Sequence, residues 1–368
     1  MQFTIANDVL LPRLQQAVSV VERRATIPIL SNLFFSFRDG TLFITGSDTE
    51  VQVISELEMD VDEDADFTVP ARKLIDLLKA LPESCPIKFQ VNDDRVVLTA
   101  ASSRYALSTL PAEDYPAFEL DEAACKVTLP ASLLEQGLRK TFAFMGQQDV
   151  RYFLNGVMME FAGNIFRCVS SDGHRMAVFE DSLGEASSSG VIRQFILPRK
   201  AVLELLRLLP DQDIQVRIEV AANTCSFVLP GLRFSTKLIE GRYPDFRRVL
   251  PATISHVVHI ARSDIKSVLA RIAILTSEKS RAVMLHIKDD CIHFEAHCMD
   301  NDSAHDTLSA EIAGPNIDLC FNVNYMLDVV GTMSSDTMRF SLAEQTHTAL
   351  FEDVEDPRAR YLVMPLLV

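Results

Sequence analysis

A run of cysteines and histidines near residue 291 contains the residue types that bind zinc. Cys291, His293, His297 and Cys298 fall within eight residues, and thiolate and imidazole groups are common zinc ligands. On a strand, however, Cys291, His293 and His297 share one face while Cys298 points away. Ligands spaced along one strand do not form a compact tetrahedral set. We therefore expect the polar face of a sheet strand here and predict no metal ion.

The segment from Asp172 to Arg175 could form an acid–base pair, because Asp172 and His174 would point the same way on a strand. No serine or cysteine stands beside them in a nucleophile elbow, and the sequence contains no Walker A, GxGxxG or HExxH motif. We predict a turn in which Gly173 permits close packing, with no catalytic residue and no cofactor. A metal-dependent hydrolase that uses Asp172, His174 and the residues 291–297 is the alternative from the enzyme class.

The composition is that of a globular protein with more than one domain. The 368 residues are 48% hydrophobic and 23% charged, and this length predicts two or three domains. The sequence has no stretch of about 18 apolar residues, so we expect no membrane partner. The first residues do not resemble a signal peptide, and the seven cysteines are scattered. We therefore expect a cytoplasmic protein with reduced thiols.

One unit recurs three times along the chain. Residues 69–82 (VPARKLIDLLKALP) align without a gap with 197–210 (LPRKAVLELLRLLP), and 321–333 (FNVNYMLDVVGTM) keeps the apolar spacing. Segments 3–21, 127–145 and 258–275 each predict a short strand followed by an amphipathic helix. Alternating apolar and polar segments after them predict antiparallel strands. We predict the α+β class, with three repeated domains at 1–122, 123–252 and 253–368.

Positive charge is concentrated in the six predicted helices, 8–21, 71–80, 129–144, 199–209, 263–276 and 321–333. These contain eleven bases and six acids, whereas the whole chain has 35 bases, 51 acids and a net charge of −16. One interpretation is that each helix simply has a solvated face. The other is that the helices line a surface that meets a polyanion, where Lys and Arg attract phosphates without reading sequence.

Five motifs on this threefold repeat resemble those of the bacterial DNA polymerase III beta subunits, the replicative sliding clamps. They are 24–33 (RATIPILSNL), 148–156 (QDVRYFLNG), 171–175 (SDGHR), 241–251 (GRYPDFRRVLP) and 361–365 (YLVMP). The resemblance covers essentially the whole chain. It implies three domains of the DNA-clamp fold, each with two inner helices and antiparallel sheets outside. It further implies a head-to-tail homodimer that forms a ring around double-stranded DNA, as a processivity factor and not an enzyme.

The resemblance also implies which residues face the DNA. Arg24 and Gln148 would touch it, with Tyr152 and Phe153 on the nearby loop, although Phe153 departs from the family's usual tyrosine. Bases of the helices would add a diffuse positive field, among them Arg72, Lys73, Arg139, Lys140, Arg199 and Lys200.

Clamp partners carry a short peptide with an apolar end, and the resemblance implies a pocket for it between the second and third domains. The implied pocket residues are Leu154, Ser171, Gly173, His174, Arg175, Met176, Pro244, Arg248, Val249, Thr346, Leu362, Met364, Pro365 and Leu366. Walls of Leu, Met, Val and Pro accept Leu or Phe anchors. Thr346 and Leu366 depart from the residues commonest there. The implied partners are the catalytic subunit of the polymerase, the clamp loader and other proteins with such a motif.

The resemblance places the dimer contact between domain 1 of one chain and domain 3 of the other. A strand edge at 102–110 would pair across this joint and would thereby be covered. The residues expected there are Lys73, Arg104, Tyr105, Leu107, Ile274 and Leu275, with Asp300, Asp302 or Asp306 opposite the two bases. The alternative is an ordinary intradomain strand and helix end. A repeat protein that binds proteins but no DNA is the third class of function considered.

Overall fold

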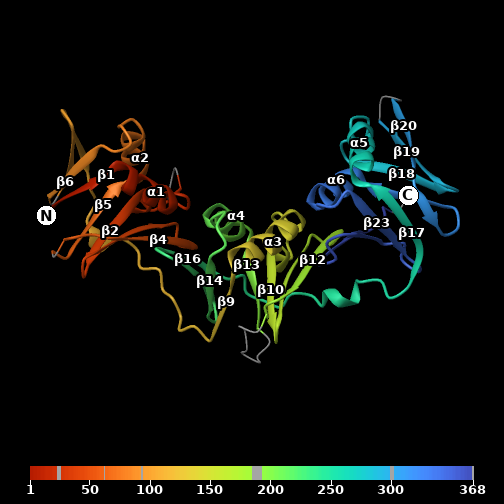
Figure 1. Cartoon of the computed structure of the whole chain (residues 1–368), viewed down its shortest axis with the longest axis horizontal. Coiled ribbons are helices and arrows are strands. Elements are labelled where there is room, and N and C mark those ends of the chain that lie inside the picture. The colour runs from red at the N-terminus through yellow and green to blue at the C-terminus, as the bar shows by residue number, and fades with distance from the viewer. Residues whose placement is uncertain (23–25, 62, 93, 185–192, 299–301, 367–368) are drawn as a thin grey trace. The chain divides into compact units, whose positions relative to one another are not determined.

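The part of the chain that the structure describes contains all six predicted helices, whose places Figure 1 shows. The computed structural model describes residues 1–22, 26–61, 63–92, 94–184, 193–298 and 302–366. Two helices begin directly after Pro70 or Pro198, which ends the preceding strand because proline fixes φ and lacks an N–H donor. The helices are α1 (Asn7–Val18), α2 (Ala71–Lys79), α3 (Ala131–Thr141), α4 (Arg199–Leu208), α5 (Arg262–Ala273) and α6 (Val323–Thr332).

The first of two compact units comprises Met1–Ser132 and Leu203–Leu238 and contains two antiparallel sheets. The four-stranded sheet has the order β1 (Gln2–Ala6), β6 (Pro86–Asn92), β7 (Arg95–Ala100) and β8 (Ser103–Ser108). The eight-stranded sheet has the order β5 (Ala65–Pro70), β2 (Asn32–Arg38), β3 (Thr41–Ser47), β4 (Val51–Glu58), β16 (Leu232–Lys237), β15 (Thr224–Leu229), β14 (Gln215–Val220) and β9 (Cys125–Pro130). Strands β4 and β16 belong to neighbouring repeats, so one sheet spans both.

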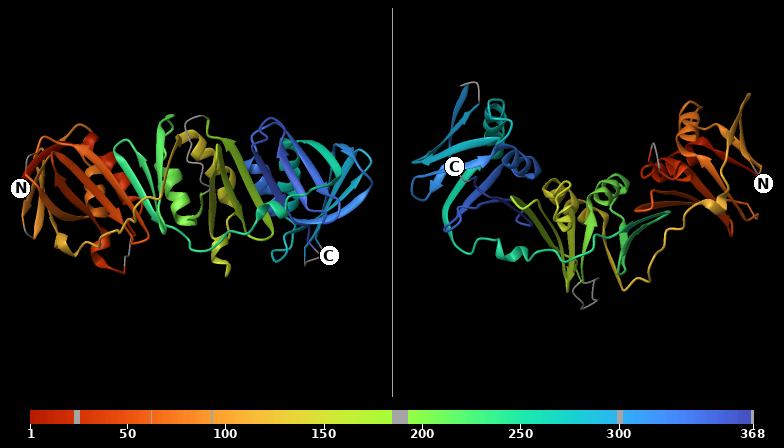
Figure 2. Two further views of the ribbon diagram at one scale, coloured as in Figure 1. Left: turned by 90° about the horizontal axis from the view of Figure 1, so that it is seen from below. Right: turned by 180° about the vertical axis from the view of Figure 1, so that it is seen from behind.

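The second compact unit comprises Leu133–Val202 and Ile239–Val368 and again contains two antiparallel sheets. The nine-stranded sheet has the order β13 (Arg193–Pro198), β10 (Gly156–Ala162), β11 (Ile165–Ser171), β12 (Arg175–Ser182), β25 (Ala359–Val363), β24 (Ala349–Asp353), β23 (Thr337–Ala343), β17 (Ile254–Ala261) and β21 (Glu311–Ala313). The four-stranded sheet has the order β20 (Ser303–Ser309), β19 (Cys291–His297), β18 (Ala282–Lys288) and β22 (Ile317–Asn322). Figure 2 shows these sheets from two further sides.

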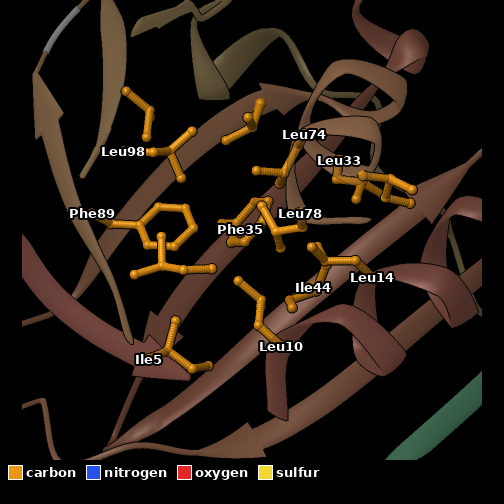
Figure 3. Packing of buried hydrophobic residues seen from close by; sticks show 14 of the residues in the cluster. Ile5, Leu10, Leu14, Leu33, Phe35, Ile44, Leu74, Leu78, Phe89 and Leu98 are labelled. Atoms are coloured by element: carbon orange, nitrogen blue, oxygen red, sulfur yellow. The ribbon is translucent and has the colours of Figure 1, made fainter. Parts of the chain in front are cut away.

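Helices pack on the apolar faces of the sheets. In the first unit α1 and α2 contact each other and the strands on both sides, and Leu10, Leu74 and Phe89 meet in one core (Figure 3). Burying such side chains stabilises the fold by about 25 cal/mol for each Å² of apolar surface removed from water. The end of α1 approaches β3 so closely that a Cβ on Gly46 would lie 2.0 Å from the Ala17 carbonyl oxygen. Glycine is therefore the residue that fits this position.

Strands of neighbouring repeats pair with each other, which explains why the boundaries of the two compact units differ from those of the three repeats. The pair β12–β25 joins the second and third repeats as β4–β16 joins the first and second. The domain boundaries at 122/123 and 252/253 therefore stay a prediction. Among the described residues, no helix is both long and apolar enough to cross a membrane.

Candidate functional site

An apolar pocket of about 240 Å³ lies within the second unit. Its base is built by neighbouring strands, because residues opposite each other in register present their side chains on the same face. Met158 on β10 lies opposite Val169 on β11, and Met176 on β12 lies opposite Leu362 on β25. All four are buried in one hydrophobic cluster with Leu154. The pocket residues are Arg151, Phe153, Leu154, Ser171, Gly173, His174, Arg175, Met176, Tyr243, Pro244, Asp245, Phe246, Val249, Leu362 and Met364.

The turn between β11 and β12 forms one wall of the pocket. The Asp172 carboxylate accepts hydrogen bonds from the backbone N–H groups of His174 and Arg175, each at 3.0 Å, and from the Arg175 guanidinium at 2.9 Å. Gly173 has φ +88°, and a Cβ there would lie 2.6 Å from the Arg151 guanidinium. Asp172 therefore shapes the turn, as predicted from Gly173, and its carboxylate is engaged by the backbone and Arg175.

Arg175 binds this wall to a helix of the last repeat. Its Nη1 donates to Asp328 Oδ2 at 2.5 Å, and its Nη2 donates to the Ala143 carbonyl oxygen at 2.9 Å. The guanidinium also lies 4.4 Å from the centre of the Tyr325 ring, within the range of a cation–π interaction. Hydrogen bonds from the Arg175 guanidinium thus hold the pocket wall to α6 and to the Ala143 backbone.

Ten of the fourteen predicted pocket residues line the pocket and four do not. Arg248 is 85% exposed and its Nε lies 3.3 Å from Asp245. Thr346 bonds instead to Thr348, and Pro365 does not reach the pocket. Leu366 lines another cavity of about 410 Å³, where its N–H donates to the Cys320 carbonyl oxygen at 2.7 Å. These four residues therefore lie outside this cavity in the structure, and their role in binding a peptide stays a prediction.

Five residues that line the pocket were not predicted for it, namely Arg151, Phe153, Tyr243, Asp245 and Phe246. Burial raises the pKa of Tyr243, so its hydroxyl stays protonated. The recurrence of Tyr-Pro at 115–116 and 243–244 was the signal that could have identified Tyr243. Phe153, which the resemblance implies near the DNA, lines this pocket, and its contact with DNA stays a prediction.

Family comparisons assign the chain along its length. Three family models match in order: DNA polymerase III beta subunit, N-terminal domain, at residues 1–119, the central domain at 128–245 and the C-terminal domain at 247–367. The chain belongs to the DNA polymerase III beta subunit family. It is a three-domain sliding clamp, a processivity subunit of the replicative polymerase and not a catalytic enzyme.

Relatives and solved structures agree with this assignment. The beta sliding clamps of Pseudomonas aeruginosa and Escherichia coli are 36% and 35% identical over 367 residues, which covers 100% of both chains in each case. A crystal structure of the Pseudomonas aeruginosa subunit matches with a TM-score of 0.97 at 36% identity, covering 100% of both chains. A Bacillus subtilis clamp shares the fold at 22% identity, with a TM-score of 0.92 over 100% of this chain and 99% of its own.

The histidine-rich strand of the clamp is β19, as expected for a polar sheet face. Cys291 Sγ lies 3.4 Å from His293 Nε2, and His297 Nε2 lies 2.6 Å from Glu295 Oε1. The hydrogen bond from His297 lowers the pKa of the Glu295 carboxyl. No group of three or more potential ligands is placed to hold a metal ion in the ranges that the structure describes.

The predicted DNA-contact residues differ in exposure. Arg24 lies outside the described residues. Arg72, Lys73, Arg139 and Gln148 are exposed, and Tyr152 is 57% exposed. Arg199 and Lys200 are partly buried, and burial together with the nearby Arg175 charge lowers the pKa of Arg199. The exposed bases suit diffuse phosphate attraction.

Lys140 does not suit the role predicted for it. It is 8% exposed, and its Nζ lies 3.0 Å from Asp356 Oδ2. Buried cations are normally paired in this way, so this side chain joins α3 to the turn before β25. The amphipathic pattern placed Lys140 on the polar face but could not show that another segment covers it.

Acid should weaken the contact between Lys140 and Asp356. Burial alone would raise the pKa of Asp356, but hydrogen bonds from Arg358 and Lys140 outweigh it and lower the pKa to about 2. A carboxyl with a depressed pKa stabilises the fold above its unfolded value of about 4 and loses that contribution as the pH falls towards 2. We expect the melting temperature of the wild type to fall over this window more steeply than that of Asp356→Asn. If the melting temperatures of the two proteins fell equally with pH, the ionised Asp356 carboxylate would not be stabilising the fold.

Proposed function

We propose that two copies of this clamp close head to tail into a ring around duplex DNA and that replication proteins bind the ring through the apolar pocket. The observation that supports the ring is that two strands each lie at the edge of a sheet and are paired on one side only. Within the described residues β8 pairs only with β7, and β20 pairs only with β19. An unpaired edge offers a row of N–H and C=O groups to another chain, so each edge is suited to continue a sheet across a joint.

Side chains near these edges support the proposed joint. Ile274, directly after α5, is 77% exposed, whereas Leu107 is 8% exposed and belongs to its own core. Arg104 and Lys73 are exposed. Among the acids proposed opposite them, Asp306 already binds Arg271 at 2.6 Å and Asp300 lies outside the described residues. We propose Ile274 and Leu275 as the apolar part of the contact and a twofold axis that repeats it.

The pocket supports a peptide ligand with an apolar end. Its walls carry Leu154, Met176 and Val249, and its rim carries Arg151 and His174 for the peptide backbone. A Pseudomonas aeruginosa clamp has been solved bound to griselimycin. We propose the polymerase catalytic subunit, the clamp loader and other proteins with such a peptide as partners, in the cytoplasm, and domain boundaries at 122/123 and 252/253.

The test of the proposed function is loading onto nicked circular DNA followed by linearisation. A ring should stay on the circle and leave through the cut ends, because enclosure and not adhesion holds it. Retention on the linear DNA would identify a groove binder and would contradict the ring. Absence of any loading on the circle by a matching clamp loader would contradict DNA encirclement itself.

Exposed helix bases should set how long the ring stays on DNA. We expect the triple variant Arg72→Glu, Lys79→Glu, Arg139→Glu, all at exposed helix positions outside the proposed joint, to leave nicked circles at least about tenfold faster, because three phosphate-attracting charges become repulsive. Single-molecule lifetimes at two salt concentrations measure this. The control variant Lys88→Glu, Lys126→Glu, Lys237→Glu carries the same charge change on exposed strand positions. Equal lifetimes for the two variants would show that these helices do not face DNA.

A further inference from the structure

A row of polar side chains crosses four neighbouring strands beside the pocket. Gln194 on β13, Glu160 on β10, Arg167 on β11 and Glu180 on β12 lie opposite one another in register. Glu160 accepts hydrogen bonds from Arg167 and Gln194, and Arg167 Nε donates to Glu180 at 2.5 Å. Met158, two residues before Glu160, is on the same face of β10 and belongs to the pocket cluster. The polar row and the hydrophobic cluster at the pocket therefore lie on the same face of the sheet.

Glu160 is the most buried member of the row and needs a second cation. It is 2% exposed, and a buried carboxylate is stable only when it is paired and hydrogen-bonded. Arg167 is shared between Glu160 and Glu180. Arg247 supplies the further positive charge, with its Nη2 2.8 Å from Glu160 Oε1. Two arginines thus face two glutamates, and Arg247 Nη1 also lies 3.9 Å from Oδ1 of the pocket residue Asp245.

Arg247 comes from the short helical turn η6 (Phe246–Arg248), which carries part of the pocket wall. Its guanidinium lies 4.6 Å from the centre of the Phe246 ring, a distance at which the cation and the ring attract each other. Phe246 is 4% exposed and lines the pocket with Tyr243, Pro244 and Val249. Arg247 itself does not line the pocket. A continuous chain of contacts therefore runs from Glu160 through Arg247 to Phe246 and the pocket.

We propose that Glu160 and Arg247 are positioning residues of the peptide pocket. The buried Glu160 carboxylate fixes the Arg247 guanidinium, and Arg247 fixes the ring of Phe246 in the wall. Arginine suits this role because its planar group can bind a carboxylate and stack on an aromatic ring at the same time. The inference rests on the proposed peptide-binding function. It adds that the ion pair between Glu160 and Arg247 fixes the position of the Phe246 ring in the pocket wall.

The test measures binding of a fluorescent synthetic peptide, ending in Leu-Phe, to the full-length protein. We expect Arg247→Met to weaken binding about tenfold, and Arg247→Lys, which keeps the charge but loses the planar stacking, to weaken it about threefold. The matched control is Arg339→Met, which removes another half-exposed arginine paired with a glutamate of the same sheet, Glu352. It should change affinity less than about twofold, because Arg339 bonds to Glu352 and neither residue lines the pocket.

A double-mutant cycle separates positioning from a general loss of stability. In a Phe246→Leu background, Arg247→Met should change peptide affinity less than about twofold, because the residue through which it acts is gone. Melting temperatures should fall further in Arg247→Met than in Arg339→Met, because Arg247 pairs with a carboxylate that is 2% exposed and Arg339 with one that is 18% exposed, so binding is compared at a temperature at which both variants are folded. Two results would overturn the inference but not the proposed function. One is that Arg247→Met binds the peptide as tightly as the wild type does. The other is that Arg247→Met weakens binding as much in the Phe246→Leu background as in the wild type. Failure of the wild type to bind the peptide would overturn the proposed function together with the inference.

Discussion

Ile274→Asp should convert the clamp from a dimer to a monomer and abolish its retention on circular DNA. Ile274 is 77% exposed at the end of α5 and has little role in the core of its own chain. In the proposed ring it becomes buried at both joints, where an unpaired carboxylate costs several kcal/mol. Because the twofold axis doubles the effect, we expect a single-chain mass in light scattering at micromolar concentration. Retention on nicked circles should fall to background.

A matched substitution distinguishes the joint from a general effect of surface charge. Val354, in the turn after β24, is also an exposed aliphatic residue, 51% accessible in the same unit. Val354→Asp adds the same charge and should leave the dimer intact. Dimeric Ile274→Asp protein would show that this end of α5 is not in the joint, and the strand edges would then need another partner.

Sequence patterning predicted the elements well because their causes are local. Prolines at 70 and 198, the 3.6-residue period of the helices and the alternation of the strands act over a few neighbours. Pairing between repeats is different, since Leu232 lies opposite Ser55 and Arg175 opposite Val363. Such contacts join segments more than a hundred residues apart, and a local pattern does not specify them.

Site residues were predicted where a single strand or turn determines their position. They were missed where a segment far along the chain determines whether they are buried. The turn at 171–176 was found from its motif, because Asp172 and Gly173 shape it locally. The sequence predicted Lys140 as a surface base, but Asp356, on a turn far along the chain, pairs with it in a buried contact that a local pattern does not reveal. Phe246 was missed because its burial depends on a ring contact with Arg247 and on the strand cluster beneath.

Val249→Asp should remove peptide binding while leaving the fold and the ring intact. Val249 lines the pocket at its rim and is 40% exposed, so the new carboxylate stays hydrated in the free protein. A bound Leu or Phe anchor would remove that hydration without offering a partner to the charge. We expect affinity for the peptide ending in Leu-Phe to fall at least about thirtyfold, measured by fluorescence anisotropy, which corresponds to about 2 kcal/mol.

Ile254 provides a closely matched control, because it is 41% exposed in the same unit and does not line the pocket. Ile254→Asp should bind the peptide within about twofold of the wild type, since distant substitutions act independently. Both variants should remain dimers and slide from linearised circles. A ring that still encloses DNA but no longer binds the peptide would separate the two proposed activities, because enclosure depends on the strand edges and partner binding on the pocket. Equal peptide affinity of the two variants would instead place the peptide elsewhere on the clamp.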